Sequence, residues 1–165
     1  MPASANALFH RCVALWRPIT RALENLQAPA ALLARAYVAE AFLRSGLTKI
    51  QDWDTTLALF ADEYHVPLLS PGAAAVMGTA GELALPVLLM LGLGGRFAAL
   101  GLSVVNGVAV ISLSEIAPAA LQQHITWGVL LAGLAIHGVG RWSLDCAVVA
   151  PALCWSKPGH QVLKR

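Results

Sequence analysis

Charged side chains are scarce in this sequence. Lys, Arg, Asp and Glu together make up 12% of its 165 residues, whereas 58% are hydrophobic, and the mean hydropathy is +0.66. A soluble domain carries about 25% charged residues, so the shortage indicates a protein embedded in a lipid bilayer. A net charge of only +2, without basic runs interleaved with aromatic residues, argues against nucleic-acid binding.

Cysteine and catalytic motifs are also scarce. The sequence has three cysteines, Cys12, Cys146 and Cys154. Their odd number predicts no disulfide framework, and the lack of a CxxC spacing argues against a haem-attachment site. HExxH and P-loop motifs are missing too, as is a nucleophile with a paired base. No cleavable signal peptide is evident in the first apolar run. We therefore expect no covalently bound cofactor and no catalysis by this chain alone.

Apolar segments, by contrast, are abundant. Residues 30–50, 72–91, 97–113 and 123–139 are each long enough to cross a bilayer as a helix. Residues 55–64 predict a short interfacial helix between the first two segments. The sequence therefore predicts an all-α integral membrane protein with a four-helix transmembrane bundle.

The two ends of the chain differ from this central part. Residues 7–28 place apolar side chains at helical spacing among arginines, which predicts an amphipathic helix on the membrane surface, split or kinked at Pro18. A helix packed on a partner protein is the alternative. Residues 146–165 predict an interfacial segment followed by a basic tail.

Lys and Arg residues predict the orientation of the bundle, because cytoplasmic loops are enriched in them. With four spans, the side that carries both termini collects nearly all basic residues, whereas Lys49 lies alone at the edge of the other side. We therefore expect both termini in the cytoplasm. The three cysteines would then face a reducing compartment, which argues against structural disulfides.

Polar residues within the predicted spans indicate an intramembrane site. A charged side chain at the bilayer centre costs about 2.5–3.5 kcal/mol on insertion scales, and a helix rises about 1.5 Å per residue, which sets the depth of each residue. The expected interior polar or ligand site comprises Tyr37, Glu40, Arg44, Thr48, Glu82 and Asn106. Either it handles a proton or ligand, or an ion pair and a protonated carboxyl only fix helix packing.

Other polar residues are expected to lie outside this site. Arg35 and Lys49 lie near the ends of their span and are expected to snorkel to the two interfaces. Asp145 can pair with Arg141 or Arg96. His65 and His124 are expected near the outer face, where a metal site would need acidic neighbours; without a fixed spacing, no metal is assigned.

Four short segments resemble the DoxX family: 45–49 (SGLTK), 82–86 (ELALP), 91–99 (LGLGGRFAA) and 143–145 (SLD). The resemblance implies a small four-span protein of the bacterial inner membrane, divided here into an N-terminal segment 1–28, a membrane domain 29–145 and a tail 146–165. The matching family positions are Gly46, Lys49, Glu82, Arg96, Ser143 and Asp145.

The resemblance also bears on function. Some members of the family are implicated as membrane subunits of quinone-linked oxidoreductases. The leading expectation is therefore a membrane subunit or anchor of a redox-linked complex, with quinone as a ligand and a protein partner that supplies electrons. A small transporter or ion-binding protein, and a structural anchor that recruits a partner enzyme, are the alternatives.

Overall fold

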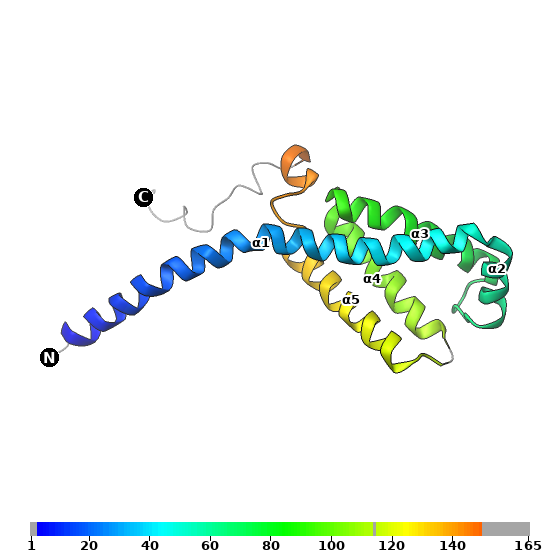
Figure 1. Cartoon of the computed structure of the whole chain (residues 1–165), viewed down its shortest axis with the longest axis horizontal. Coiled ribbons are helices and arrows are strands. Elements are labelled where there is room, and N and C mark those ends of the chain that lie inside the picture. Colours follow the sequence, from blue (N-terminus) through cyan, green and yellow to red (C-terminus); the bar gives the residue numbers. More distant parts are fainter. Residues whose placement is uncertain (1–2, 114, 150–165) are drawn as a thin grey trace.

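The computed structural model describes residues 3–113 and 115–149, and within them the chain is all-α, as predicted. Figure 1 shows its arrangement. The elements are α1 (Ala3–Gln51), α2 (Trp53–Asp62), α3 (Pro71–Leu91), α4 (Gly95–Ser112), α5 (Pro118–His137) and a π-helical turn, η1 (Asp145–Val149). Helices α3, α4 and α5 are each long and apolar enough to span a membrane. The second half of α1 packs chiefly on α3, while α4 packs on α3 and α5.

Helix α1 is longer than the sequence pattern predicted. The expected surface helix and the first bundle helix form one continuous helix that runs through Pro18 and Pro29. A proline in a helix removes one backbone hydrogen bond and introduces a kink, but α1 resumes after each of them. Side chains from residue 14 to residue 27 lie away from the bundle, and burial begins at Ala28. Figure 1 shows this first part projecting from the bundle as an arm.

The core lies where the second half of α1 meets the other long helices. Val38 and Phe42 of α1 pack in one buried cluster with Leu89, Leu102 and Leu131, which come from α3, α4 and α5. In a bilayer the lipid tails are as apolar as these side chains, so their packing stabilises the bundle mainly through close van der Waals contact between helices. The sequence predicted this apolar interior, because each helix contributes aliphatic residues at helical spacing.

Helix α2 and the segment after it close one end of the bundle. Asp52 caps α2 by accepting a hydrogen bond of 3.0 Å from the Thr55 amide, and hydrogen bonding to the Thr55 side chain and then to its amide lowers the pKa of Asp52. Phe60 then packs on Ala74 and Ala75 of α3. The short interfacial helix expected at residues 55–64 is therefore present as α2, and it covers the start of α3.

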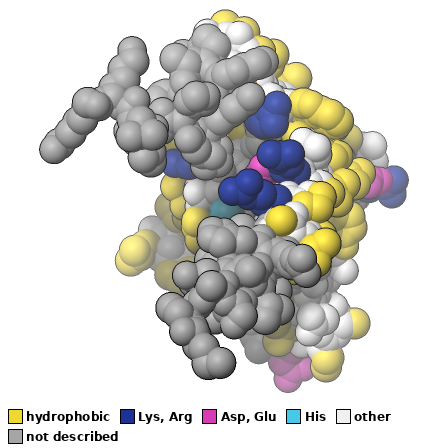
Figure 2. Space-filling model, turned by 90° about the vertical axis from the view of Figure 1, so that its left-hand side faces the viewer, with side chains coloured by type: hydrophobic (Ala, Val, Ile, Leu, Met, Phe, Trp, Pro, Cys, Tyr) yellow, Lys and Arg dark blue, Asp and Glu magenta, His cyan; other side chains and the backbone are white. Residues whose placement is uncertain are grey.

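The opposite end of the bundle is basic. Figure 2 shows Lys and Arg side chains gathered on the end from which the arm projects. The exposed arginines of the arm and of the nearby turns include Arg17, Arg21, Arg96 and Arg141. This is the end that the charge distribution assigned to the cytoplasm.

One expectation about cysteine is wrong. Cys146, in η1, is disulfide-bonded. The expectation rested on sequence spacing and on the side of the membrane, whereas disulfide pairing depends on which cysteines the tertiary structure brings together. Residues 150–165, which include Cys154 and most of the predicted tail, lie outside the described part of the chain.

Candidate functional site

The strongest site candidate is an ion pair between α1 and α3. Lys49 Nζ lies 2.5 Å from Glu82 Oε2 and also donates a hydrogen bond of 2.8 Å to Ser45 Oγ, one turn earlier on α1. The Lys49 and Glu82 side chains are only 15% and 10% exposed. Gly46 allows the two helices to approach closely here, since a Cβ at this position would lie 2.9 Å from the Leu83 side chain.

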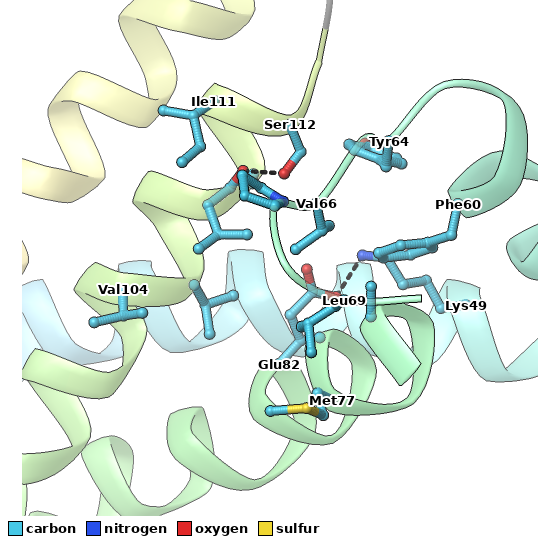
Figure 3. Close-up of a pocket in the computed structure, with 16 residues that line it drawn as sticks. Lys49, Phe60, Tyr64, Val66, Leu69, Met77, Glu82, Val104, Ile111 and Ser112 are labelled. Atoms are coloured by element: carbon cyan, nitrogen blue, oxygen red, sulfur yellow. Dashed lines mark hydrogen bonds and ion pairs between the residues drawn. The ribbon is translucent and has the colours of Figure 1, made fainter. Parts of the chain in front are cut away.

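An apolar cavity of about 390 Å³ adjoins this ion pair. Its wall is formed by side chains from four helices and the loop after α2, and Figure 3 shows them around the Lys49–Glu82 pair. Met77 on α3 and Val104 and Ile111 on α4 line the cavity and are also exposed on the outer surface of the bundle. The cavity therefore opens between α3 and α4, on the surface that faces lipid.

Tyr64 supplies a second polar group at the cavity. Burial raises the pKa of its phenol, and the negative charges of Glu82 and Glu63 raise it further. The hydroxyl is therefore protonated near neutral pH and is available as a hydrogen-bond donor. The backbone beside it is held in place because the His65 amide donates to the Ser112 carbonyl at 2.9 Å, which ties this segment to the end of α4.

Asn106 is buried, as expected, but it belongs to a different contact. Its Nδ2 donates to the His124 carbonyl at 2.9 Å, and its Oδ1 lies 2.8 Å from His124 Nδ1. These bonds join α4 to α5. His65 instead contacts the Glu63 carbonyl, and the described residues contain no group of three potential metal ligands.

Four of the six expected interior residues lie on the outside of α1, so that part of the prediction is wrong. Glu40 and Arg44 form an ion pair of 2.7 Å, but their side chains are 60% and 79% exposed. Tyr37 is exposed and accepts a hydrogen bond of 2.6 Å from Gln123, and Thr48 donates to a backbone carbonyl of its own helix. The helical spacing correctly placed them on one face, but it could not show which face α3 and α5 cover.

Lys49 was expected to snorkel but instead pairs with Glu82 inside the bundle. Arg35 was also misplaced by the prediction. Instead of snorkelling, it is fully buried, and its guanidinium donates to the carbonyls of Met90 at 3.2 Å and Trp142 at 2.5 Å. Met90 lies in the last turn of α3, where the helix dipole is negative and favours a cation. No short-range signal indicated this role, because both acceptors are backbone groups distant in the sequence.

Asp145 has a structural role different from the expected arginine pair. Its two carboxylate oxygens each accept a hydrogen bond of 2.8 Å, one from the Gly94 amide and one from the Gly95 amide. It thereby caps the first turn of α4, where free amides and the helix dipole favour an anion. Neighbouring Ser143 is buried and packs at Gly92, where an added Cβ would lie 2.4 Å from Ser143 Cβ.

Comparison with known proteins adds one finding. The sequence model of the DoxX family matches residues 30–115, which contain Lys49, Glu82 and the residues that line the cavity. Ser143 and Asp145 lie beyond this match. No curated protein and no solved structure matches the chain.

Proposed function

Because the chain belongs to the DoxX family and is a multi-pass membrane protein, we propose that it is the membrane subunit of a redox-linked complex in the bacterial inner membrane and that it binds a quinone in the cavity beside Lys49 and Glu82. The observation that carries the proposal is an apolar cavity with a buried ion pair in its wall. Small-molecule sites generally combine an apolar lining with a few well-placed polar groups, in volumes of about 300–1,000 Å³.

The shape and position of the cavity suit a ligand that is dissolved in the bilayer. Its opening lies between α3 and α4, among exposed apolar side chains such as Met77 and Val104. A quinone has an apolar tail and a ring with two carbonyl oxygens. The tail would extend through this opening into lipid, while the ring would lie against Phe60 and the polar wall.

The ion pair supplies the chemistry that such a ring requires. Lys49 can donate a hydrogen bond to a carbonyl oxygen, since an ammonium has three donors and two of them bind Glu82 and Ser45. Reduction of a quinone consumes two electrons and two protons. Glu82 is the carboxyl group at the cavity that can relay a proton, and Tyr64 can donate a second hydrogen bond.

Electrons would come from a protein partner. The sequence has no CxxCH motif through which the chain could attach a haem. A membrane subunit that binds the quinone and positions it for an electron-transferring partner is the function that these features support best.

Quinone occupancy tests the proposal. Purified wild-type protein should contain quinone that organic solvent extracts, or should take it up from proteoliposomes loaded with ubiquinone or menaquinone. Ala109→Phe, which fills the cavity without changing its charge, should lower the occupancy at least about tenfold. Ala132→Phe is the matched control, because Ala132 is exposed on α5 and does not line the cavity.

The ion pair is tested in the same assay. Lys49→Met combined with Glu82→Leu should reduce quinone uptake while it preserves the fold, because neither charge is left unpaired. Wild-type protein without quinone, both as purified and after reconstitution, would refute the proposed function. Equal occupancy in Ala109→Phe and Ala132→Phe would place any bound quinone outside this cavity.

A further inference from the structure

The outer face of α1 carries an exposed seam that runs from Trp16 to Leu47. Within the bundle, its positions alternate in steps of three and four residues, and all of them are exposed: Ala30, Leu33, Tyr37, Glu40, Arg44 and Leu47. The same spacing continues back through the arm. There it consists of the exposed residues Trp16, Ile19, Leu23 and Leu26. We call these ten residues the α1 seam.

The α1 seam lies opposite the face that packs in the bundle. The buried residues Ala28, Arg35 and Phe42 recur every seven positions on the inner face, whereas the seam residues at the same interval, such as Leu26 and Leu33, are exposed. Alternating steps of three and four residues are the spacing of a left-handed coiled coil, in which two helices interlock along such a seam.

Both halves of the α1 seam are unfavourable if they stay uncovered. The arm extends beyond the bundle (Figure 1), and Trp16, Leu23 and Leu26 are each more than half exposed on it. In the bundle, Glu40 and Arg44 would face hydrocarbon, where charged side chains are costly even when paired. One partner helix that follows the entire seam would relieve both costs.

The charges indicate the identity of that partner. We propose that the α1 seam is the interface of a parallel homodimer, in which Glu40 of each copy pairs with Arg44 of the partner subunit. Copies inserted in the same orientation have parallel α1 helices, so residues at the same depth face each other. Glu40 then lies one helical turn from Arg44 of the other copy. The resulting layer is neutral and contains two ion pairs between the copies.

Such a layer would also fix the register of the two helices. A polar residue at one core position of a coiled coil specifies alignment and oligomeric state at some cost in stability. A shift of one heptad would place Glu40 opposite Leu33 or Leu47 and would leave both charges without their partners in the other copy. The dimer is independent of what the cavity beside Glu82 binds, since the α1 seam and the cavity share no residue.

Charge reversal provides the test, with the full chain in detergent micelles and its mass measured by sedimentation over a range of concentrations. Wild-type protein should be a dimer. Glu40→Arg and Arg44→Glu should each raise the dimer dissociation constant at least about tenfold, because either change places four like charges in one layer. The double variant, Glu40→Arg with Arg44→Glu, should return the dimer dissociation constant to within about threefold of the wild-type value. Both copies of a homodimer carry both substitutions, so the two ion pairs form again with their charges reversed. Asp62→Arg is the matched control, with the same change in charge at an exposed position outside the seam.

The arm requires its own variants. Leu23→Asp should weaken the dimer by a similar factor, whereas Asn25→Asp, at an exposed arm position outside the seam, should not. Circular dichroism should show unchanged helix content in each variant. A wild-type chain that stays monomeric would overturn the proposal and would indicate a different membrane protein on this face. Failure of the double variant to restore dimers would overturn the Glu40–Arg44 pairing, and a dimer indifferent to Leu23→Asp would indicate that the arm lies on the membrane instead.

Discussion

Lys49 at the end of α1 is joined to Glu82 in the middle of α3 by an ion pair of 2.5 Å between residues 33 positions apart. Both side chains are largely removed from solvent. A buried ion pair gives little net stability compared with well-packed apolar residues, but the loss of one partner leaves a buried charge. The pair therefore makes the contact between α1 and α3 sensitive to single substitutions.

This sensitivity predicts a specific order of stabilities. Glu82→Gln or Lys49→Met alone should lower the free energy of unfolding by about 3 kcal/mol, because each leaves a buried charge unpaired. The double variant, Lys49→Met with Glu82→Leu, should lose less than either single variant. Unfolding by sodium dodecyl sulfate in mixed micelles measures the differences. A double variant that is as unstable as the sum of the two single variants would contradict a coupled ion pair.

Tyr64 predicts a dependence on pH. Its pKa in the folded protein is raised by burial and by the charges of Glu82 and Glu63, so folding favours the neutral phenol. The associated stability is complete below the ordinary tyrosine pKa of about 10 and is lost as the pH rises further. Phenolate absorbance, with Tyr64→Phe as the blank, should show titration above the ordinary value. Glu82→Gln should lower this pKa, and an unchanged titration would show that the charge of Glu82 does not reach the phenol.

At position 35, arginine and lysine should differ in how well they stabilise the fold. Its guanidinium binds the Met90 and Trp142 carbonyls at once, whereas a lysine is a single point charge without the planar fork. Hydrogen bonds to charged groups contribute about 1.5–3 kcal/mol each, so Arg35→Lys should destabilise the fold by roughly 2 kcal/mol and Arg35→Leu by more. The exposed Arg21→Lys on the arm should have no measurable effect. Equal stability of wild type and Arg35→Lys in the same unfolding assay would refute this role.

The basic end of the molecule predicts its orientation. Exposed arginines, including Arg17, Arg96 and Arg141, lie on the arm and at the nearby turns, and basic residues favour the cytoplasmic side. A reporter that is active only in the periplasm should therefore be silent when it is fused after Arg165. The same reporter inserted in the loop after α2, near Pro67, should be active. The reverse pattern would overturn the orientation and would place the disulfide of Cys146 in the oxidising compartment.

The sequence alone determined much of this protein. Its composition indicated the membrane, and its hydropathy located α3, α4 and α5, because an apolar segment of sufficient length has few other stable environments. Glu82 and Asn106 were correctly expected to be buried, because a polar side chain within an apolar span usually faces the interior of the bundle. The Asp52 cap of α2 is likewise a local feature that short-range chemistry dictates.

The tertiary structure alone decided which face of α1 turns inward. The first bundle segment has polar residues around its whole circumference, so periodicity could not choose between Arg35 and the Glu40–Arg44 pair. The inward face is set by packing, because Val38 and Phe42 fit among the apolar side chains of the other helices. Arg35 lies on the same face, and there it donates hydrogen bonds to two backbone carbonyls distant in the sequence. Lys49 turns inward for the same reason, since Glu82 lies opposite it. The partner of a charge is set by the three-dimensional fit of helices, and local spacing carries no information about that fit.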